Sequence, residues 1–200
     1  MDPALVQQGR AVEMQYMEEL QVLEDSDLDT CLAETGRQPL PTDWVDIDKG
    51  DVHRPNGRCR LAAQETKYRS TTDREDWAAM FAATPLYGAS RLQLSLPMTG
   101  PRCEVEGDDE VLMLLDISRA HLHSPLRRVV FVKIDGKVYR LLKAMYGLRD
   151  AGASFDRKVL DVMNLMGVTL GKFSICVGYR RAGDSLVQLV RWCAGETTSR

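Results

Sequence analysis

The stretch Val129-Val-Phe-Val-Lys-Ile-Asp-Gly-Lys-Val-Tyr-Arg-Leu-Leu142 decides the fold class of this chain. Its two halves are rich in β-branched, aromatic and aliphatic residues, which is typical of strands. Asp135-Gly136 lies between them, and this pair accepts the positive φ angles of a type I′ turn. The stretch therefore predicts a hairpin of two antiparallel strands, residues 129–134 and 137–142.

The C-terminal side of this hairpin predicts one helix and a second hairpin. Residues 154–166 carry apolar side chains on one helical stripe, and Gly167 is placed to end the helix. Residues 173–179 and 186–192 predict two strands that flank a turn at residues 180–184. We expect the last eight residues, 193–200, to form a disordered tail.

A continuous apolar run, residues 111–116, lies upstream of the central hairpin and ends in Asp116. This pattern is typical of a buried central strand that places one carboxylate at the edge of a sheet. Asp116 is therefore the most interesting acid in the chain. A helix N-cap or a salt-bridge partner would also explain a carboxylate at this position.

The segments further upstream predict shorter elements. Residues 44–47 and 58–66 have the length of strands. The capping box Thr72-Asp-Arg-Glu75 predicts a helix over residues 73–83, and residues 86–96 fit either a strand or a helix. Together with the hairpins, this irregular order predicts an α+β fold.

Charge divides the chain unevenly. Residues 1–53 hold 13 acidic and 3 basic side chains, whereas residues 54–200 hold 16 acidic and 23 basic ones, a balance of +7. Apolar residues at helical spacing in the acidic part predict one or two amphipathic helices that end near Thr35, before Gly36. We therefore expect an acidic helical segment at 1–43, a body at 44–192, and the tail.

Composition excludes several classes of protein. No window approaches 18 uninterrupted apolar residues, and the N-terminal sequence lacks the layout of a secretory signal. We therefore expect an intracellular protein, cytoplasmic or nuclear, without a membrane partner. The five cysteines are scattered without a C-x-x-C pair, so neither a disulfide framework nor a structural zinc site is predicted.

Two motifs around the central hairpin point to a known family. The first is Asp116-Ile-Ser-Arg-Ala-His-Leu-His123, and the second is Leu142-Lys-Ala-Met-Tyr-Gly-Leu-Arg-Asp-Ala151. They resemble two motifs of the reverse transcriptase of copia-type retrotransposons, which are D-V-x-x-A-F-L-H-G and L-K-x-x-L-Y-G-L-K-Q-A-P, respectively. Upstream, Trp44-Val-Asp-Ile-Asp-Lys-Gly50 and Arg58-Cys-Arg-Leu-Ala-Ala63 are similar to the family's entry segment and its K-A-R-L-V-A segment. The motifs follow in the family's order, over residues 44–192.

The resemblance implies the fingers and the first half of the palm of a right-hand polymerase, with an incomplete antiparallel sheet and packed helices. Such an enzyme copies an RNA template by adding nucleotides with two divalent ions, Mg²⁺ or Mn²⁺. By the same matching, Asp116 is a catalytic residue and metal ligand, and Arg60 lies over the incoming triphosphate. Tyr146 and Gly147 line the nucleotide and template pocket, and His121 takes the place of an aromatic ring that excludes a ribose 2′-hydroxyl. The implied partners are an RNA or DNA template-primer, deoxynucleotides and the other domains of a Pol polyprotein.

The sequence departs from the family at two places. The family has an Asp-Asp pair shortly after the strand that corresponds to residues 186–192, but no aspartate lies beyond Asp184. The family's Q-A-P is Asp150-Ala-Gly152, which puts an acid near a pocket that binds phosphate. We therefore expect a polymerase fragment that is inactive alone. The alternatives are a non-catalytic nucleic-acid-binding remnant, supported by the basic body, and a relic without function.

Other readings of single residues stay open. Arg60 is also compatible with an ordinary basic strand residue, and Tyr146-Gly147 with a simple turn. His121 and His123 have the spacing of two metal ligands on one face of a strand, but a third ligand is not evident. Residues 108–110 are most simply an acidic loop, and Arg180-Arg181 a solvated hairpin tip. The sequence contains no phosphate-binding G-x-x-x-x-G-K-[ST] motif.

Overall fold

The computed structural model of this chain describes residues 2–50, 56–66, 82, 88, 91, 95, 117–172, 176–182 and 185–191. Its contacts divide the chain into two units, Met1–Phe81 with Arg119–Lys158 and Ala82–Ser118 with Val159–Arg200. The described part is a mixed α+β structure with a five-stranded mixed sheet and helices, which confirms the predicted class.

The first unit contains a sheet with the strand order β1-β5-β4-β2-β3. Its strands are β1 (Leu23–Ser26), β2 (Leu40–Asp48), β3 (Gly57–Ala63), β4 (Phe131–Ile134) and β5 (Lys137–Leu141). Within this sheet β2 and β4 run parallel, and the other neighbouring pairs are antiparallel. The expectation of an antiparallel sheet was therefore wrong for this one pair. β2 thus extends across residue 43, where the sequence predicts the end of the acidic segment.

The central hairpin forms as predicted. Ile134 pairs with Lys137, and the two turn residues between them, Asp135 and Gly136, have φ angles of 47° and 87°. Both turn residues therefore have the positive φ that a type I′ turn requires.

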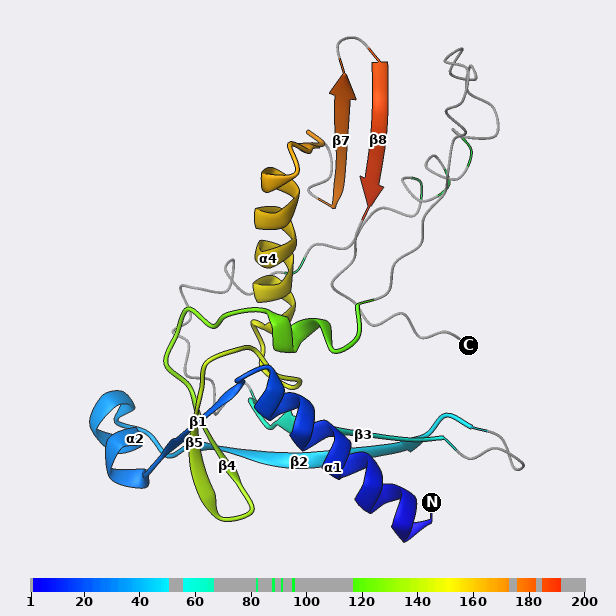
Figure 1. Ribbon diagram of the computed structural model, residues 1–200. Coiled ribbons are helices and arrows are strands. Elements are labelled where there is room, and N and C mark those ends of the chain that lie inside the picture. Colours follow the sequence, from blue (N-terminus) through cyan, green and yellow to red (C-terminus); the bar gives the residue numbers. More distant parts are fainter. Residues whose placement is uncertain are drawn as a thin grey trace. The chain divides into compact units, whose positions relative to one another are not determined.

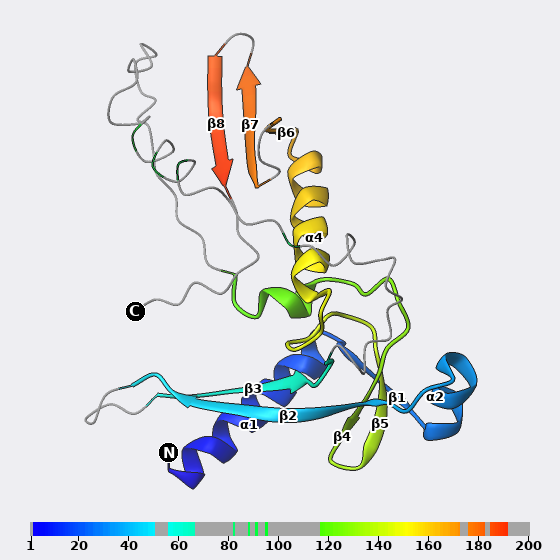
Figure 2. The ribbon, with the colours of Figure 1, turned by 180° about the vertical axis from the view of Figure 1, so that it is seen from behind.

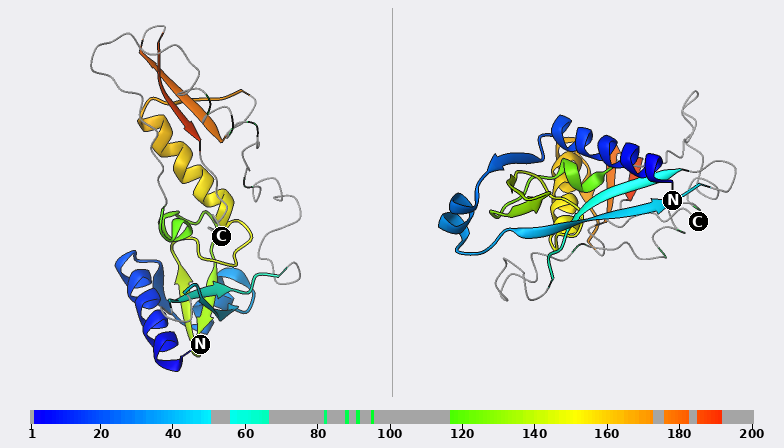
Figure 3. Two further views of the ribbon diagram at one scale, coloured as in Figure 1. Left: turned by 90° about the vertical axis from the view of Figure 1, so that its right-hand side faces the viewer. Right: turned by 90° about the horizontal axis from the view of Figure 1, so that it is seen from below.

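A longer hairpin, β2 with β3, carries the N-terminal helix α1 (Pro3–Glu19) on one face (Figure 1). Seen from below, α1 runs along both strands (Figure 3). Seen from behind, β2 and β3 lie in front of α1, so that their other face is in view (Figure 2). Asp48 closes the hairpin, because its Oδ1 accepts the backbone N–H groups of Gly50 and Asn56 at 2.9 Å each.

The acidic segment contains a strand that the sequence did not predict. Between α1 and α2 (Leu28–Thr35), β1 pairs along its whole length with β5. Its sequence, Leu-Glu-Asp-Ser, has little strand propensity, so the pairing with β5 decides its conformation. The predicted end at Thr35 is confirmed, since Gly36 has φ 64° and its N–H bonds to the carbonyl of Leu32 at 2.8 Å.

The hydrophobic core of the first unit lies between the sheet, α1 and the segments around the central hairpin. Its most buried members come from both the acidic segment and the body. They are Met17, Val22, Leu61, Leu122, Val130, Val132, Ala144 and Met145. The acidic segment is therefore part of the same core as the body strands.

The second unit contains a three-stranded sheet in the order β6-β7-β8. Its strands are β6 (Thr169–Leu170), β7 (Val177–Ala182) and β8 (Ser185–Arg191). The helix α4 (Ala151–Leu165) precedes them in the chain, and its residues 151–158 belong to the first unit. Gly167, with φ 71°, follows the helix as predicted. The prediction that residues 180–182 belong to the turn was wrong, because they continue β7 through a shift of register at Arg180/Arg181.

Several predicted elements lie outside the described residues. They are the helix at 73–83, the strand at 111–116 with Asp116, most of residues 86–96, and the tail at 193–200. Among the helices that the structure describes, none combines the length and the apolar content of a membrane span.

Candidate functional site

Four of the five site residues predicted from the sequence lie together in the first unit. Arg60 comes from β3, His121 from the 3₁₀ helix η2 (Ala120–His123), and Tyr146 and Gly147 from the loop between β5 and α4. The Arg60 guanidinium carbon lies 4.8 Å from the centre of the Tyr146 ring. The fifth residue, Asp116, lies outside the described residues.

The register of the long hairpin places Arg60 on a defined face. Side chains alternate along β3, so Cys59 and Leu61 are buried while Arg60 points to the other side. The Cys59 thiol donates to the carbonyl of Val6 in α1 at 3.6 Å, which identifies its face as the one covered by α1. Arg60 therefore lies on the face opposite α1, where its cross-strand neighbour is Val45.

His121 completes an aromatic cluster. Its ring meets the Tyr146 ring edge-on, with centroids 5.4 Å apart and planes at 80°, and meets Phe155 in the same way at 6.4 Å. Leu122, fully buried, anchors η2 in the core. Tyr146 is thus in ring contact with both a guanidinium and an imidazole.

The backbone around Gly147 explains why glycine stands there. Gly147 has φ +82°, and a Cβ at this position would overlap the Ala63 carbonyl group, with 2.9 Å to its carbon. The N–H of Ala63 donates to the carbonyl of Tyr146 at 2.8 Å, and Ala62 forms a parallel bridge with Tyr146. The loop therefore lies directly along the end of β3, which brings Tyr146 to Arg60.

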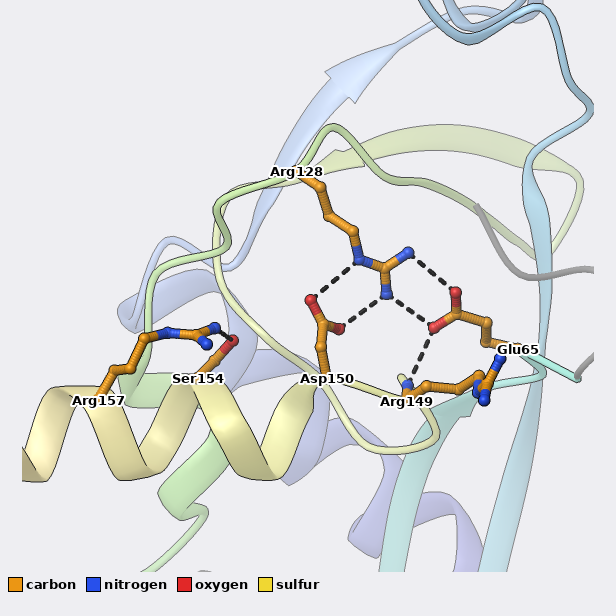
Figure 4. Close-up of polar contacts among 6 residues, drawn as sticks. All are labelled: Glu65, Arg128, Arg149, Asp150, Ser154 and Arg157. Atoms are coloured by element: carbon orange, nitrogen blue, oxygen red, sulfur yellow. Dashed lines mark hydrogen bonds and ion pairs between the residues drawn. The ribbon is translucent and has the colours of Figure 1, made fainter. Parts of the chain in front are cut away.

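The carboxylate of Asp150, where the resembled motif has glutamine, is paired rather than directed at Arg60. It accepts two hydrogen bonds from the Arg128 guanidinium, at 2.7 and 2.9 Å (Figure 4). The same guanidinium donates to Glu65. Sequence reasoning missed Arg128 and Glu65, because they are 22 and 85 positions from Asp150 and share no motif with it.

His121 and His123 do not lie on one face of a strand. Both residues belong to η2, and successive residues of a 3₁₀ helix point about 120° apart. Within the described ranges, no group of three or more histidine, cysteine, aspartate or glutamate side chains gathers as a metal site. The divalent ions of the resembled family, with Asp116 as ligand, therefore stay a prediction.

Arg180 and Arg181 lie in β7 of the second unit, and both are exposed. The Arg181 guanidinium lies 5.7 Å from the Tyr179 ring centre. This arrangement agrees with the solvated position expected from the sequence, although the two residues belong to a strand rather than to the hairpin tip.

No protein-family model matches this chain, and neither does any curated protein or solved structure. The resemblance to copia-type reverse transcriptases is therefore a resemblance of the sequence motifs alone.

Proposed function

We propose that this chain contacts a nucleoside triphosphate and its template in the manner of copia-type reverse transcriptases, through Arg60, His121, Tyr146 and Gly147. One observation carries the proposal. Three segments that are distant in sequence, each resembling a different motif of that family, bring these residues into contact with one another.

The chemistry of the cluster suits a phosphate ligand. A guanidinium has paired N–H groups in one plane, which match the oxygens of a phosphate group. The tyrosine ring holds the orientation of Arg60. Tyr146 and His121 supply flat surfaces of the kind that nucleic-acid bases stack on.

Metal chemistry in this proposal depends on Asp116. Divalent ions, when bound, would neutralise the triphosphate and activate the primer hydroxyl. The sequence matches one of the three family carboxylates, whereas two ions require several oxygen ligands. We therefore propose triphosphate binding without primer extension for this 200-residue chain.

Calorimetry with dTTP and Mg²⁺ tests the proposal. Arg60→Gln should weaken binding about tenfold or more, because a charge-assisted phosphate contact is lost. Arg58→Gln is the matched control, since it removes the same charge from the same face of β3. Equal losses in both variants, or no binding by the wild type, would refute a specific role for Arg60. We also expect no primer extension on an RNA template. Extension by the wild type that is lost in Asp116→Ala would contradict this expectation.

A second candidate function is nucleic-acid binding without catalysis, favoured by the face opposite α1. There Val45 and Ile47 are 44% and 46% exposed and pair across the hairpin with Arg60 and Arg58. Single-stranded RNA should then bind without sequence preference, with log K falling linearly against log salt. Absence of binding to a labelled single-stranded RNA at low salt would eliminate this function.

A further inference from the structure

Arg128 joins the segment after β3 to the C-terminal end of the loop between β5 and α4, which carries Tyr146. It lies just before β4, while Glu65 follows β3 and Asp150 directly precedes α4 (Figure 4). Its Nη1 and Nη2 donate to the two oxygens of Glu65 at 2.8 and 2.7 Å. Its Nε and Nη2 donate to the two oxygens of Asp150 at 2.9 and 2.7 Å.

The three charged groups are largely withdrawn from solvent. The exposed fractions of the side chains are 0% for Glu65, 12% for Asp150 and 18% for Arg128. Burial alone lowers the pKa of Arg128, but the hydrogen bonds with Asp150 and Glu65 outweigh it and raise this pKa above its ordinary value. Removing one partner would leave the others as poorly compensated buried charges.

The ion pairs tie the C-terminal end of the loop to the segment that follows β3. Glu65 follows Ala63, whose N–H donates to the Tyr146 carbonyl. Asp150 lies three positions after Gly147, and the N–H of Arg149 donates to Glu65 Oε2 at 2.9 Å. The end of β3, the Tyr146 loop and the start of α4 are therefore held by one guanidinium.

We infer that Arg128 is a positioning residue: by bridging Glu65 and Asp150, it holds Tyr146 and Gly147 against Ala63 and so sets the ring on which Arg60 lies. The effect of Arg128 on nucleotide contact rests on the proposed function, whereas its effect on the position of the loop is independent of that function. Neither Arg128 nor Glu65 belongs to the residues that the family resemblance assigns to the site.

Amide hydrogen exchange tests the loop directly. The N–H of Ala63 reports the contact with Tyr146, and the N–H of Leu141, bonded to Val130 at 2.9 Å, reports the central hairpin. Arg128→Lys keeps the charge but cannot form both bidentate pairs. Arg140→Met is the control, because it removes an arginine from the half-exposed pair with Glu34 at 3.3 Å.

In Arg128→Lys, we expect exchange at Ala63 to become about tenfold faster or more, with Leu141 changed much less. The control should leave the exchange at Ala63 unchanged. Equal acceleration at both amides, or unchanged exchange at Ala63, would overturn the inference. The triple variant Arg128→Met, Glu65→Gln, Asp150→Asn removes all three charges of this cluster, so it provides a second test if the lysine variant does not fold. It too should exchange fast at Ala63, and slow exchange there would overturn the inference.

Binding of dTTP with Mg²⁺ separates the inference from the proposed function. If the wild type binds and Arg128→Lys binds at least about tenfold more weakly, the positioning role is supported. If both bind equally although Ala63 exchanges faster, the positioning role is overturned. If the wild type does not bind, the proposed function fails, while the exchange data still decide whether Arg128 holds the loop.

Discussion

Gly147 lies so close to Ala63 that a Cβ at position 147 would overlap the Ala63 carbonyl group. Its φ of +82° adds a second penalty for any L-residue. We therefore expect Gly147→Ala to lower the free energy of unfolding by at least about 3 kcal/mol, because the obstacle is backbone rather than the end of a flexible side chain, so that backbone must shift. Urea denaturation measures this loss.

Gly36→Ala is the control for the backbone penalty alone. Gly36 also has positive φ, 64°, but nothing lies within 4 Å of its ideal Cβ. This variant should lose only about 1 kcal/mol. A Gly147→Ala variant no less stable than Gly36→Ala would contradict the close approach of the loop to β3.

Gly9 and Cys59 should be energetically coupled. A Cβ at Gly9 in α1 would lie 2.7 Å from the Cys59 Sγ. In the wild type, Gly9→Ala should destabilise the fold despite the higher helix propensity of alanine. In a Cys59→Ala background the clash is gone, so the same substitution should stabilise by up to about 1 kcal/mol. A double-mutant cycle compares the change in unfolding free energy caused by Gly9→Ala in the two backgrounds. The same sign of this change in both backgrounds would contradict the packing of α1 on β3.

Acid should weaken the long hairpin through Asp48. The N–H groups of Asn56 and Gly50 hold the pKa of Asp48 below its ordinary value of 3.8. A lowered pKa in the folded state stabilises that state above the unfolded pKa, and this contribution is lost as the pH falls through the folded pKa. Asp48→Asn should be less stable than the wild type at neutral pH, and the difference should shrink as the pH falls below 3.8. A difference that does not depend on pH would rule out the carboxylate as its cause.

The Cys59 thiol should resist alkylation. Burial, with a further contribution from Asp46, raises the pKa of Cys59 to about 11. In the folded protein at about pH 8.5, we expect iodoacetamide to label Cys59 at least about tenfold more slowly than in urea. Stability linked to this thiol is present below the ordinary pKa of 9.0 and is lost as the pH rises from there to about 11. Mass spectrometry of the labelled peptide reads out the reaction, and equal rates in both states would contradict its burial.

The sequence predicted the turns and helix ends that depend on the backbone conformation of one or two residues. Asp135-Gly136 specifies its own turn, and Gly36 and Gly167 end their helices through positive φ. The strand β1 could not be predicted, because a Leu-Glu-Asp-Ser segment becomes a strand only through its pairing with β5. Long-range pairing has no periodic signature within the segment itself.

The same distinction applies to the candidate site. Motif resemblance identified Arg60, His121, Tyr146 and Gly147, which the structure brings together. It could not identify Arg128, because an ion pair between distant segments depends on which loops the fold places side by side. From the sequence, Asp150 is an acid that would repel a phosphate group in the neighbouring pocket. In the structure its carboxylate is paired with Arg128.

A nuclear magnetic resonance titration with dTTP and Mg²⁺ tests the central claim most directly. If the four residues form one nucleotide-contacting site, their resonances should shift together and follow one dissociation constant. The signals to observe are the Arg60 Nε–H, the His121 ring and the Gly147 amide. Arg60→Gln should increase this dissociation constant, and Arg58→Gln should leave it nearly unchanged. Shifts confined to other parts of the chain, or no shifts at saturating dTTP, would contradict the account.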